Sequence, residues 1–222
     1  MMEQHGITYT QEDCMVGMAR YPDKYFDLAI IDPPYGLERL KRGRSRIYIS
    51  EKSKTGLMWD IAPTQEYFNE LFRVSKNQII WGANNFNLPT TEYFIVWDKQ
   101  QTVDNFASAE YAWTNIKMPA KVFRYAIHKE MAIRKRDGGK IHPTQKPVAL
   151  YKWLLKNYAK EGDKILDTHV GSASSLIACY DMGFDAVGFE LDEDYYKSSK
   201  KRLEREMAQM RFTDYSVGGT ER

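Results

Sequence analysis

The chain has 222 residues, of which 43% are hydrophobic, and a formal net charge of +2. One hydrophobic core in one domain is the expectation for a chain of this size and composition. Its two cysteines lie far apart without a Cys-x-x-Cys spacing, which excludes a disulfide framework and a zinc site built on cysteine pairs. No apolar run approaches the length of a membrane span, and the first residues lack the features of a signal peptide, so we expect a soluble cytoplasmic protein.

Helices and strands alternate along the first two thirds of the sequence. The elements predicted there, in chain order, are a helix over 12–19, a strand over 27–32, a helix over 63–75, and strands over 77–82, 93–98, 108–114 and 122–128. Such alternation is typical of an α/β protein.

The first predicted strand ends in an unusual way. Its apolar residues, 28–31, are typical of a strand covered on both faces, and Asp32, Pro33, Pro34 and Tyr35 follow them. Because neither proline can donate a hydrogen bond to a sheet, the chain must leave the sheet after Asp32 in an extended conformation. Asp32 and Tyr35 are therefore expected at the carboxyl edge of the sheet, where open α/β sheets bind ligands. An ordinary loop whose aspartate caps a neighbouring turn is the alternative.

The last third of the sequence predicts a βαβ unit flanked by helices. In chain order its elements are a helix over 147–159, a strand over 163–167, a helix over 174–182, a strand over 185–191 and a helix over 192–209. The two strands of the unit are expected to lie parallel in one sheet.

A turn in this βαβ unit is typical of a cofactor site. The first strand ends in Asp167, and a Gly/Ser turn that contains Gly171 leads to the amino end of the helix, which suits an anion. Glu190 ends the second strand about twenty residues later, where an acid can accept hydrogen bonds from a ribose diol. The pattern indicates an adenosine-bearing cofactor. A plain strand-turn-helix is the alternative, because a dinucleotide fingerprint has three glycines and this turn has one.

Basic residues gather in two segments of the chain. Residues 37–58 carry a net charge of +5, residues 117–146 carry +7, and the rest of the chain carries −10. This distribution favours contacts with a phosphate backbone. Solvated loops rich in lysine and arginine are the alternative.

The order of these motifs resembles that of the permuted, beta-type amino-DNA methyltransferases. DPPY at 32–35 is followed by a basic segment, by HPTQKP at 142–147, by the turn after Asp167 and by Glu190. The stretches IIWGANNF, VWDK, AEYAWT and VFRY also look like those of small adenine methylases, which phages and prophages often carry.

The resemblance covers about residues 8–204 and implies a fold. That fold is α/β: a Rossmann-like S-adenosylmethionine-dependent methyltransferase fold with a mixed, mostly parallel central sheet and a circularly permuted motif order. The resemblance further implies a single methyltransferase domain over 1–222, with a basic insert at about 37–60 and a DNA-recognition segment at about 100–140.

The resemblance also implies roles for particular residues. The implied catalytic residues are Asp32, Pro33, Pro34 and Tyr35, which would accept the hydrogens of the target amine and stack on its base. The implied ligands of S-adenosylmethionine are Asp13 and Cys14 near the adenine, Glu190 on the ribose, Asp167, Thr168, His169, Gly171 and Ser172 under the methionine portion, and His142, Thr144 and Lys146 at its end. The expected DNA contacts are Arg39, Lys41, Arg42, Arg44, Arg46, Arg134, Lys135 and Arg136. No metal is expected.

The implied activity is site-specific methyl transfer from S-adenosylmethionine to the N6 amine of adenine in duplex DNA, with the base flipped out of the helix. N4-cytosine transfer uses the same geometry and stays an alternative, although an aspartate before Pro-Pro-Tyr favours adenine. An RNA or protein-amide substrate is disfavoured, because the related motif there usually begins with asparagine. A bacterial or phage-infected cell is expected, with restriction-modification as the setting. The recognition sequence, the existence of a cognate restriction enzyme, and whether the chain forms a homodimer or joins a partner subunit stay open.

One departure from the family pattern bears on the cofactor. Thr168 and His169 stand where Pro-Phe is usual, and Ala173 stands where a glycine is usual. His169 can supply a flat ring in place of phenylalanine. A non-catalytic DNA-binding subunit with an altered cofactor turn is therefore a further alternative.

Overall fold

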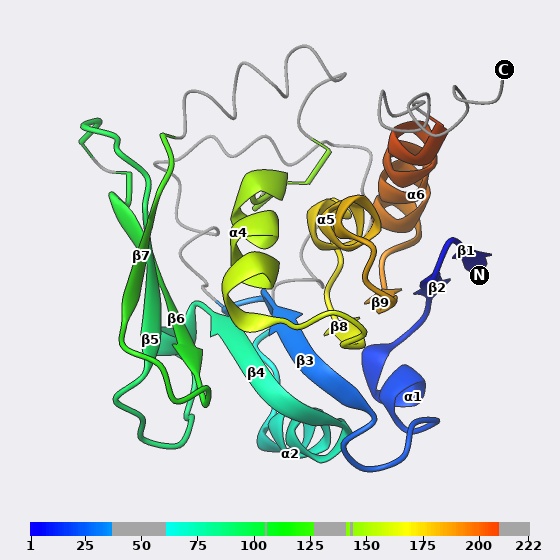
Figure 1. Ribbon diagram of the computed structural model, residues 1–222, viewed down its shortest axis with the longest axis horizontal. Helices are drawn as coiled ribbons and strands as arrows, with labels where there is room; N and C mark the ends of the chain where they lie inside the picture. The colour runs from blue at the N-terminus through cyan, green and yellow to red at the C-terminus, as the bar shows by residue number, and fades with distance from the viewer. Residues whose placement is uncertain (37–60, 105, 127–140, 143, 209–222) are drawn as a thin grey trace, which may run out of the picture.

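In the part of the chain that the structure describes, nine strands form one mixed sheet in the order β1-β2-β9-β8-β3-β4-β6-β5-β7 (Figure 1). The computed structural model describes residues 1–36, 61–104, 106–126, 141–142 and 144–208. Five of the eight strand pairings among these residues are parallel and three are antiparallel. The prediction of a mixed, mostly parallel sheet is confirmed.

The bounds of the elements follow the chain. The strands are β1 (Met2–Gln4), β2 (Ile7–Gln11), β3 (Phe26–Ile31), β4 (Ser75–Trp81), β5 (Phe94–Asp98), β6 (Ala109–Thr114), β7 (Lys121–Arg124), β8 (Ile165–Asp167) and β9 (Ala186–Glu190). The helices are α1 (Cys14–Met18), α2 (Gln65–Val74), the short 3-10 helix η2 (Ala83–Asn85), α4 (Val148–Tyr158), α5 (Ser174–Met182) and α6 (Glu193–Ala208).

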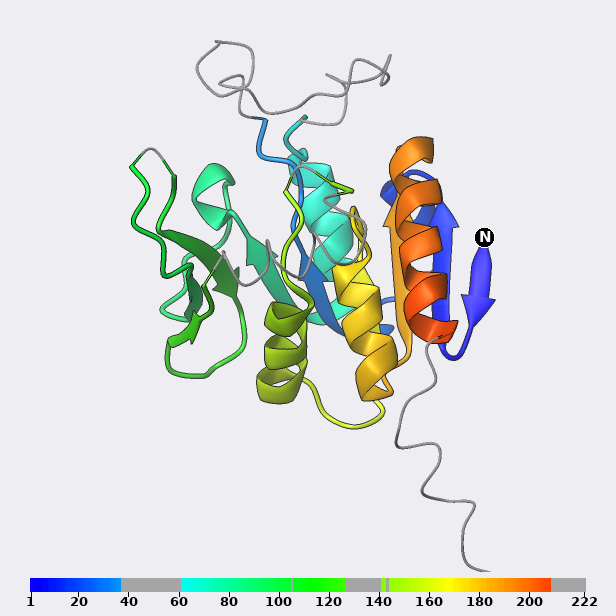
Figure 2. The ribbon, with the colours of Figure 1, turned by 90° about the horizontal axis from the view of Figure 1, so that it is seen from above.

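Helices cover both faces of the sheet and create two cores. Helices α4, α5 and α6 lie side by side on one face, and α1 and α2 lie on the other (Figures 1 and 2). Along β3, Leu28 and Ile30 enter the first core while Ala29 and Ile31 enter the second. The apolar run of this strand is continuous because both of its faces are buried. Each fully buried aliphatic side chain of this kind stabilises the fold by about 1.5–3 kcal/mol.

The hairpin β1–β2 was not among the predicted elements. Met2 is the only buried residue of β1, so its sequence shows no strand periodicity. His5 and Gly6, both with positive φ, form the two-residue turn between Gln4 and Ile7. The hairpin extends the sheet, because β2 pairs in parallel with β9, the last strand of the chain.

The parallel strands β2, β9, β8, β3 and β4 bring their carboxyl ends to one edge of the sheet. Gln11 at the end of β2 pairs with Glu190 at the end of β9, and Asp167 at the end of β8 pairs with Gly188. Strand β6 runs antiparallel to both β4 and β5, so β5 ends and β6 begins at the same edge. This carboxyl edge receives Asp32, which follows β3.

Several expected segments lie outside the described residues. They are the basic insert at 37–60, the part of the recognition segment from 127 to 140, and the chain beyond 208. The single domain over 1–222 stays a prediction. No helix within the described ranges is long and apolar enough to cross a membrane.

Candidate active site

Asp32 and Tyr35 are joined by a hydrogen bond at the carboxyl edge of the sheet. The Tyr35 hydroxyl donates to Asp32 Oδ1 over 2.7 Å. Strand β3 ends at Ile31, and residues 32–36 take part in no sheet pairing. The carboxylate therefore directly follows the buried strand, and the two prolines lie between it and the ring to which it is hydrogen-bonded.

Asp32 belongs to a group of paired charges. Its Oδ2 contacts Lys146 Nζ, and the same ammonium lies 3.1 Å from Glu110 Oε2. Glu110 in turn lies 2.5 Å from Lys99 Nζ through its other oxygen. Burial raises the pKa of the Asp32 carboxyl against the opposing effect of Lys146. For Glu110, burial is outweighed by the ammonium groups of Lys146 and Lys99, which lower its pKa to about 2.

Gly82 makes room for the ring of Tyr35. This glycine follows β4 with a φ of +66°, and a Cβ at its position would lie 2.1 Å from Tyr35 Cε1. The Tyr35 ring also meets Phe86 edge-on, with centroids 6.0 Å apart. Only glycine therefore permits both the backbone conformation and the ring position.

Replacing Gly82 with alanine is expected to displace Tyr35 and, through their hydrogen bond, Asp32. The methyl transfer that the family resemblance implies should then fall at least about tenfold. Cofactor affinity should not change, since Gly82 lies beside Tyr35. The matched control is Gly162→Ala, where φ is +83° and nothing lies within 4 Å of the new Cβ. Both variants carry the cost of a left-handed alanine, about 1–2 kcal/mol. Equal loss of transfer in the two variants would show that the Tyr35 contact does not matter.

Three acids lie at the ends of neighbouring strands, and we call Asp13, Asp167 and Glu190 the acidic trio. The backbone N–H of Glu12 donates to the carbonyl of Glu190 over 3.0 Å, which holds the turn before α1 against the end of β9. Asp13 caps α1 by accepting from Met15 N over 2.7 Å. Within α1, a Cβ at Gly17 would lie 2.5 Å from the Phe189 ring, so glycine lets the helix pack closely on β9.

Backbone and hydroxyl donors orient the other two acids of the trio. Glu190 accepts from Gly171 N over 2.8 Å and from Asp192 N over 3.0 Å. Burial outweighs these donors and raises the pKa of Glu190 to about 7. Asp167 accepts from the Ser175 hydroxyl over 2.5 Å and from His169 N over 3.0 Å. Burial likewise raises the pKa of Asp167 to about 6.

Thr168 and His169, where the family pattern has Pro-Phe, lie in a buried polar chain. The hydroxyls of Tyr67 and Thr168 are 2.6 Å apart, and Thr168 Oγ1 lies 2.9 Å from His169 Nδ1. The His169 ring meets Tyr67 edge-on at 5.4 Å between centroids. Burial lowers the pKa of His169 to about 4, so its ring is neutral at pH 7. The histidine thus packs as an uncharged ring.

The HPTQKP segment contacts the turn after Asp167 through His142 and the end of β3 through Lys146. The His142 ring lies 3.4 Å from the Cβ position of Gly171 and 4.5 Å, between centroids, from Tyr195. Thr144 Oγ1 lies 3.1 Å from His142 Nδ1. Lys146, four residues further along, contacts Asp32. The segment therefore joins the turn after Asp167 to the end of β3.

The remaining implied cofactor residues are buried or half-buried near the trio. Ser172 is buried, its hydroxyl lies 3.1 Å from that of Ser174, and its carbonyl accepts from Arg202 over 2.7 Å. Burial raises the pKa of the Cys14 thiol to about 12, so it stays protonated. The implied DNA contacts, at positions 39–46 and 134–136, lie outside the described residues.

Some residues at this edge that contact the site had no predicted role. Among them are Tyr67, Gly82, Lys99, Glu110 and Tyr151. Tyr151 is buried, with the charges of Asp167 and Asp32 acting on its hydroxyl. A signal existed for Lys99 and Glu110, because VWDK ends one predicted strand and AEYAWT begins the next.

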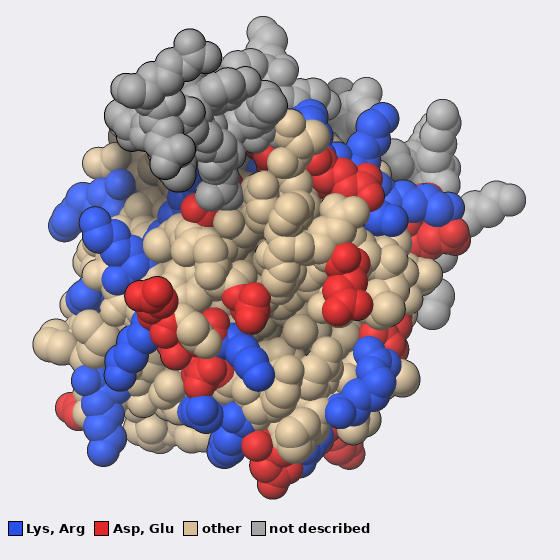
Figure 3. All heavy atoms as spheres, turned by 45° about the vertical axis from the view of Figure 1, so that its right-hand side comes forward, with Lys and Arg blue, Asp and Glu red and all other residues tan. Residues whose placement is uncertain are grey.

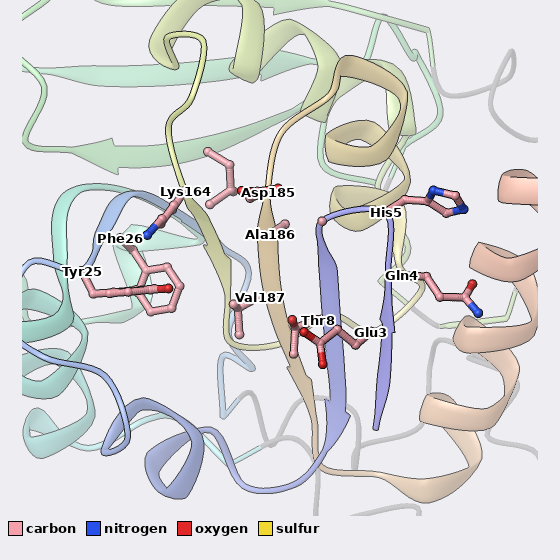
Figure 4. Close-up of a pocket in the computed structure, with 12 residues that line it drawn as sticks. Glu3, Gln4, His5, Thr8, Tyr25, Phe26, Lys164, Asp185, Ala186 and Val187 are labelled. Atoms are coloured by element: carbon pink, nitrogen blue, oxygen red, sulfur yellow. The ribbon is translucent and has the colours of Figure 1, made fainter. Parts of the chain in front are cut away.

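A hollow of about 320 Å³ lies at the opposite edge of the sheet (Figure 4). Its walls come from the amino ends of the parallel strands, including Phe26, Ile165 and Ala186. Because ligands of open α/β sheets bind at the carboxyl ends, this hollow is not the candidate site.

On the face shown in Figure 3, lysine and arginine side chains are interspersed with aspartate and glutamate. The described residues of that face therefore present no extended surface of one sign.

Comparison with known proteins identifies the family. Residues 26–201 match the DNA methylase family of the N6 and N4 type. YubD of Escherichia coli (strain K12), which is named as a methylase, is 25% identical over 211 residues, covering 88% of this chain and 89% of YubD.

Two solved structures share the fold. M1.HpyAVI in complex with SAM superposes with a TM-score of 0.57 and 18% identity, covering 88% of this chain and 99% of that one. The cytosine-N4-specific PvuII DNA methyltransferase superposes with a TM-score of 0.54 and 12% identity, covering 91% of this chain and 92% of that one. The expected Rossmann-like methyltransferase fold is thereby confirmed, and the chain belongs to the DNA methylase family.

Proposed function

We propose that the chain transfers a methyl group from S-adenosylmethionine to the N6 amine of adenine in duplex DNA. The observation that carries the proposal is the carboxylate of Asp32 at the end of β3, fixed beside Tyr35 by a 2.7 Å hydrogen bond. A carboxylate and a ring held together at this edge suit a base with an exocyclic amine.

The residues of the acidic trio fit an adenosine. Glu190 accepts two backbone hydrogen bonds, and its carboxylate retains lone pairs that can accept from ribose hydroxyls. Asp13 stands on the adjoining turn, held to β9 by the Glu12 hydrogen bond. Gly171, with a φ of +54°, gives the turn a backbone that ligands can approach closely. These residues would hold the adenine and the ribose.

The residues around Asp32 position the amine. A carboxylate oxygen of Asp32 accepts one amine hydrogen, and the carbonyl of Pro33 or Pro34 accepts the other, which directs the nitrogen lone pair. When bound, S-adenosylmethionine supplies a sulfonium methyl group, an electrophile for that nitrogen. Tyr35 stacks on the flipped base, and Asp32 can take the proton that the methylated nitrogen must lose. No covalent intermediate with the protein is needed.

Asp32 before Pro-Pro-Tyr favours adenine over cytosine. N4-cytosine transfer remains the second candidate, because the PvuII DNA methyltransferase, which shares the fold, is cytosine-N4-specific. A non-catalytic DNA-binding subunit is less well supported, since the turn after Asp167 keeps its acid, its buried serines and a packed ring at His169. The two basic segments would bind the DNA backbone and offset the cost of flipping the base.

Incubation of the full chain with S-adenosylmethionine and unmethylated bacterial DNA is expected to yield N6-methyladenine. The measurement is mass spectrometry of the digested DNA, with unincubated DNA as the control. N4-methylcytosine as the product would show that the same residues act on cytosine and not on adenine. Neither product, from a folded chain that binds the cofactor, would support the non-catalytic alternative.

A further inference from the structure

Four charged side chains from four parts of the fold, Asp32 among them, form a row of ion pairs. They alternate in sign, and we call Lys99, Glu110, Lys146 and Asp32 the charge chain. Lys99 follows β5, Glu110 lies in β6, Lys146 precedes α4 and Asp32 follows β3. Lys99 Nζ lies 2.5 Å from Glu110, and Lys146 Nζ lies 3.1 Å from Glu110 and in contact with Asp32.

Most of this charge chain is removed from solvent. The side chain of Lys146 is 4% exposed and that of Asp32 is 11% exposed. Lys146 also lies above the ring of Trp81, 5.6 Å from its centroid. Burying ion pairs stabilises a fold little compared with apolar packing, because each charge loses its hydration. The arrangement therefore calls for a role other than stability.

We infer that Lys146 is a positioning residue for Asp32 and is not the partner of the cofactor's carboxylate. Glu110 pairs with the same ammonium, and Lys99 pairs with Glu110. This inference rests on the proposed function. Lys146 fixes Oδ2 of Asp32 while Tyr35 fixes Oδ1, so the carboxylate has one orientation. Because the ammonium of Lys146 already has two carboxylate partners, it is engaged before any cofactor binds.

The charge chain also sets the protonation of Asp32. The groups that face Asp32 are Lys146, Glu110, Tyr35, Tyr151 and Asp167. Burial raises the pKa of Asp32, Lys146 opposes this rise and Glu110 adds to it. Removing Lys146 should raise the pKa of Asp32 further, whereas removing the charge of Glu110 should lower it. Two substitutions in one chain of charges should thus shift the acid limb of the activity profile in opposite directions.

The test compares the full-length wild-type chain with Lys146→Met, Lys146→Arg and Glu110→Gln. Labelled S-adenosylmethionine and total DNA from methylation-deficient bacteria are the substrates, and single-turnover transfer is measured against pH. Calorimetry gives cofactor affinity and thermal melting gives folding. Lys152→Met is the matched control, because Lys152 lies on α4 with its side chain 44% exposed and forms a surface ion pair with Asp181.

Lys146→Met is expected to lower transfer about 100-fold at pH 7, with partial recovery at higher pH and with cofactor affinity within about twofold of wild type. Lys146→Arg should restore part of the activity. Glu110→Gln should move the acid limb to lower pH. If Lys146→Met does not fold, the shift in Glu110→Gln together with unchanged cofactor affinity decides the question.

Two results would overturn the inference. One is a loss of cofactor affinity in Lys146→Met with an unmoved pH limb, which would make Lys146 a cofactor ligand. The other is a Glu110→Gln profile that is unmoved or moves to higher pH. A wild-type chain that binds the cofactor but methylates no DNA would instead overturn the proposed function, and the positioning role with it.

Discussion

Asp32→Ala is expected to lose methyl transfer by about 10²–10³-fold, while cofactor affinity stays close to that of wild type. In the proposed mechanism the carboxylate, held by the Tyr35 hydroxyl over 2.7 Å, accepts a hydrogen of the target amine and acts mainly as that amine becomes a nucleophile. An interaction made chiefly in the transition state lowers kcat without a matching change in ground-state binding. Single-turnover transfer and calorimetry with S-adenosylmethionine measure the two quantities separately.

Asp32→Asn separates the charge of this residue from its ability to accept a hydrogen bond. The amide keeps one oxygen acceptor but removes one of the two carboxylates that pair with Lys146, so we expect a loss nearly as large as that of alanine. Asp194→Ala, on the exposed side of α6, is the control for the loss of an acid. Full activity in Asp32→Ala would refute the mechanism and leave DPPY as a stiff loop.

Glu190→Ala is expected to weaken S-adenosylmethionine binding by about 10–100-fold, the effect of losing charged hydrogen bonds of about 1.5–3 kcal/mol. The side chain is held by Gly171 and Asp192 at the end of β9, where it can accept from a ribose. The affinity of wild type should also rise with pH through about 7, because the raised pKa keeps part of Glu190 protonated below that value and a protonated acid accepts fewer hydrogen bonds.

The control for Glu190 is Glu193→Ala, three residues further on, with a side chain that is 66% exposed. Its affinity and its pH dependence should match those of wild type. Calorimetry between pH 6 and pH 8 measures both variants. An affinity for Glu190→Ala equal to that of wild type, in a folded chain, would remove Glu190 from the cofactor site.

The elements with strong apolar patterns were predictable from the sequence. Strand β3 is identified by its four apolar residues and two prolines, and α4 by Tyr151, Leu154 and Leu155 on its buried face. The order of Asp32, Asp167 and Glu190 along the chain was enough to place them together, because each ends a strand that the α/β pattern makes parallel.

The charge chain could not be predicted in the same way. Glu110 lies near the start of β6, before most of the apolar residues of the strand, so the sequence alone is equally consistent with a solvated side chain. Its partner Lys146 lies far along the chain, and only the packing of four separate segments brings the two within 3.1 Å. The requirement for glycine at position 82 could not be predicted either. It arises from the ring of Tyr35, which follows β3 and approaches Gly82 at the end of β4.

The pairing of β2 with β9 has a consequence for when the acidic trio can form. Asp13 follows β2 and Glu190 ends β9, so the chain between them must be synthesised before the two acids can meet. The match to the DNA methylase family begins only at residue 26, yet the turn before α1 rests on β9 through the Glu12 hydrogen bond. In a nascent chain the hairpin β1–β2 must stay unpaired along β2 until β9 has been synthesised. Assembly of the trio is therefore a late event, and a partly translated chain has no complete set of these acids with which to bind a ligand.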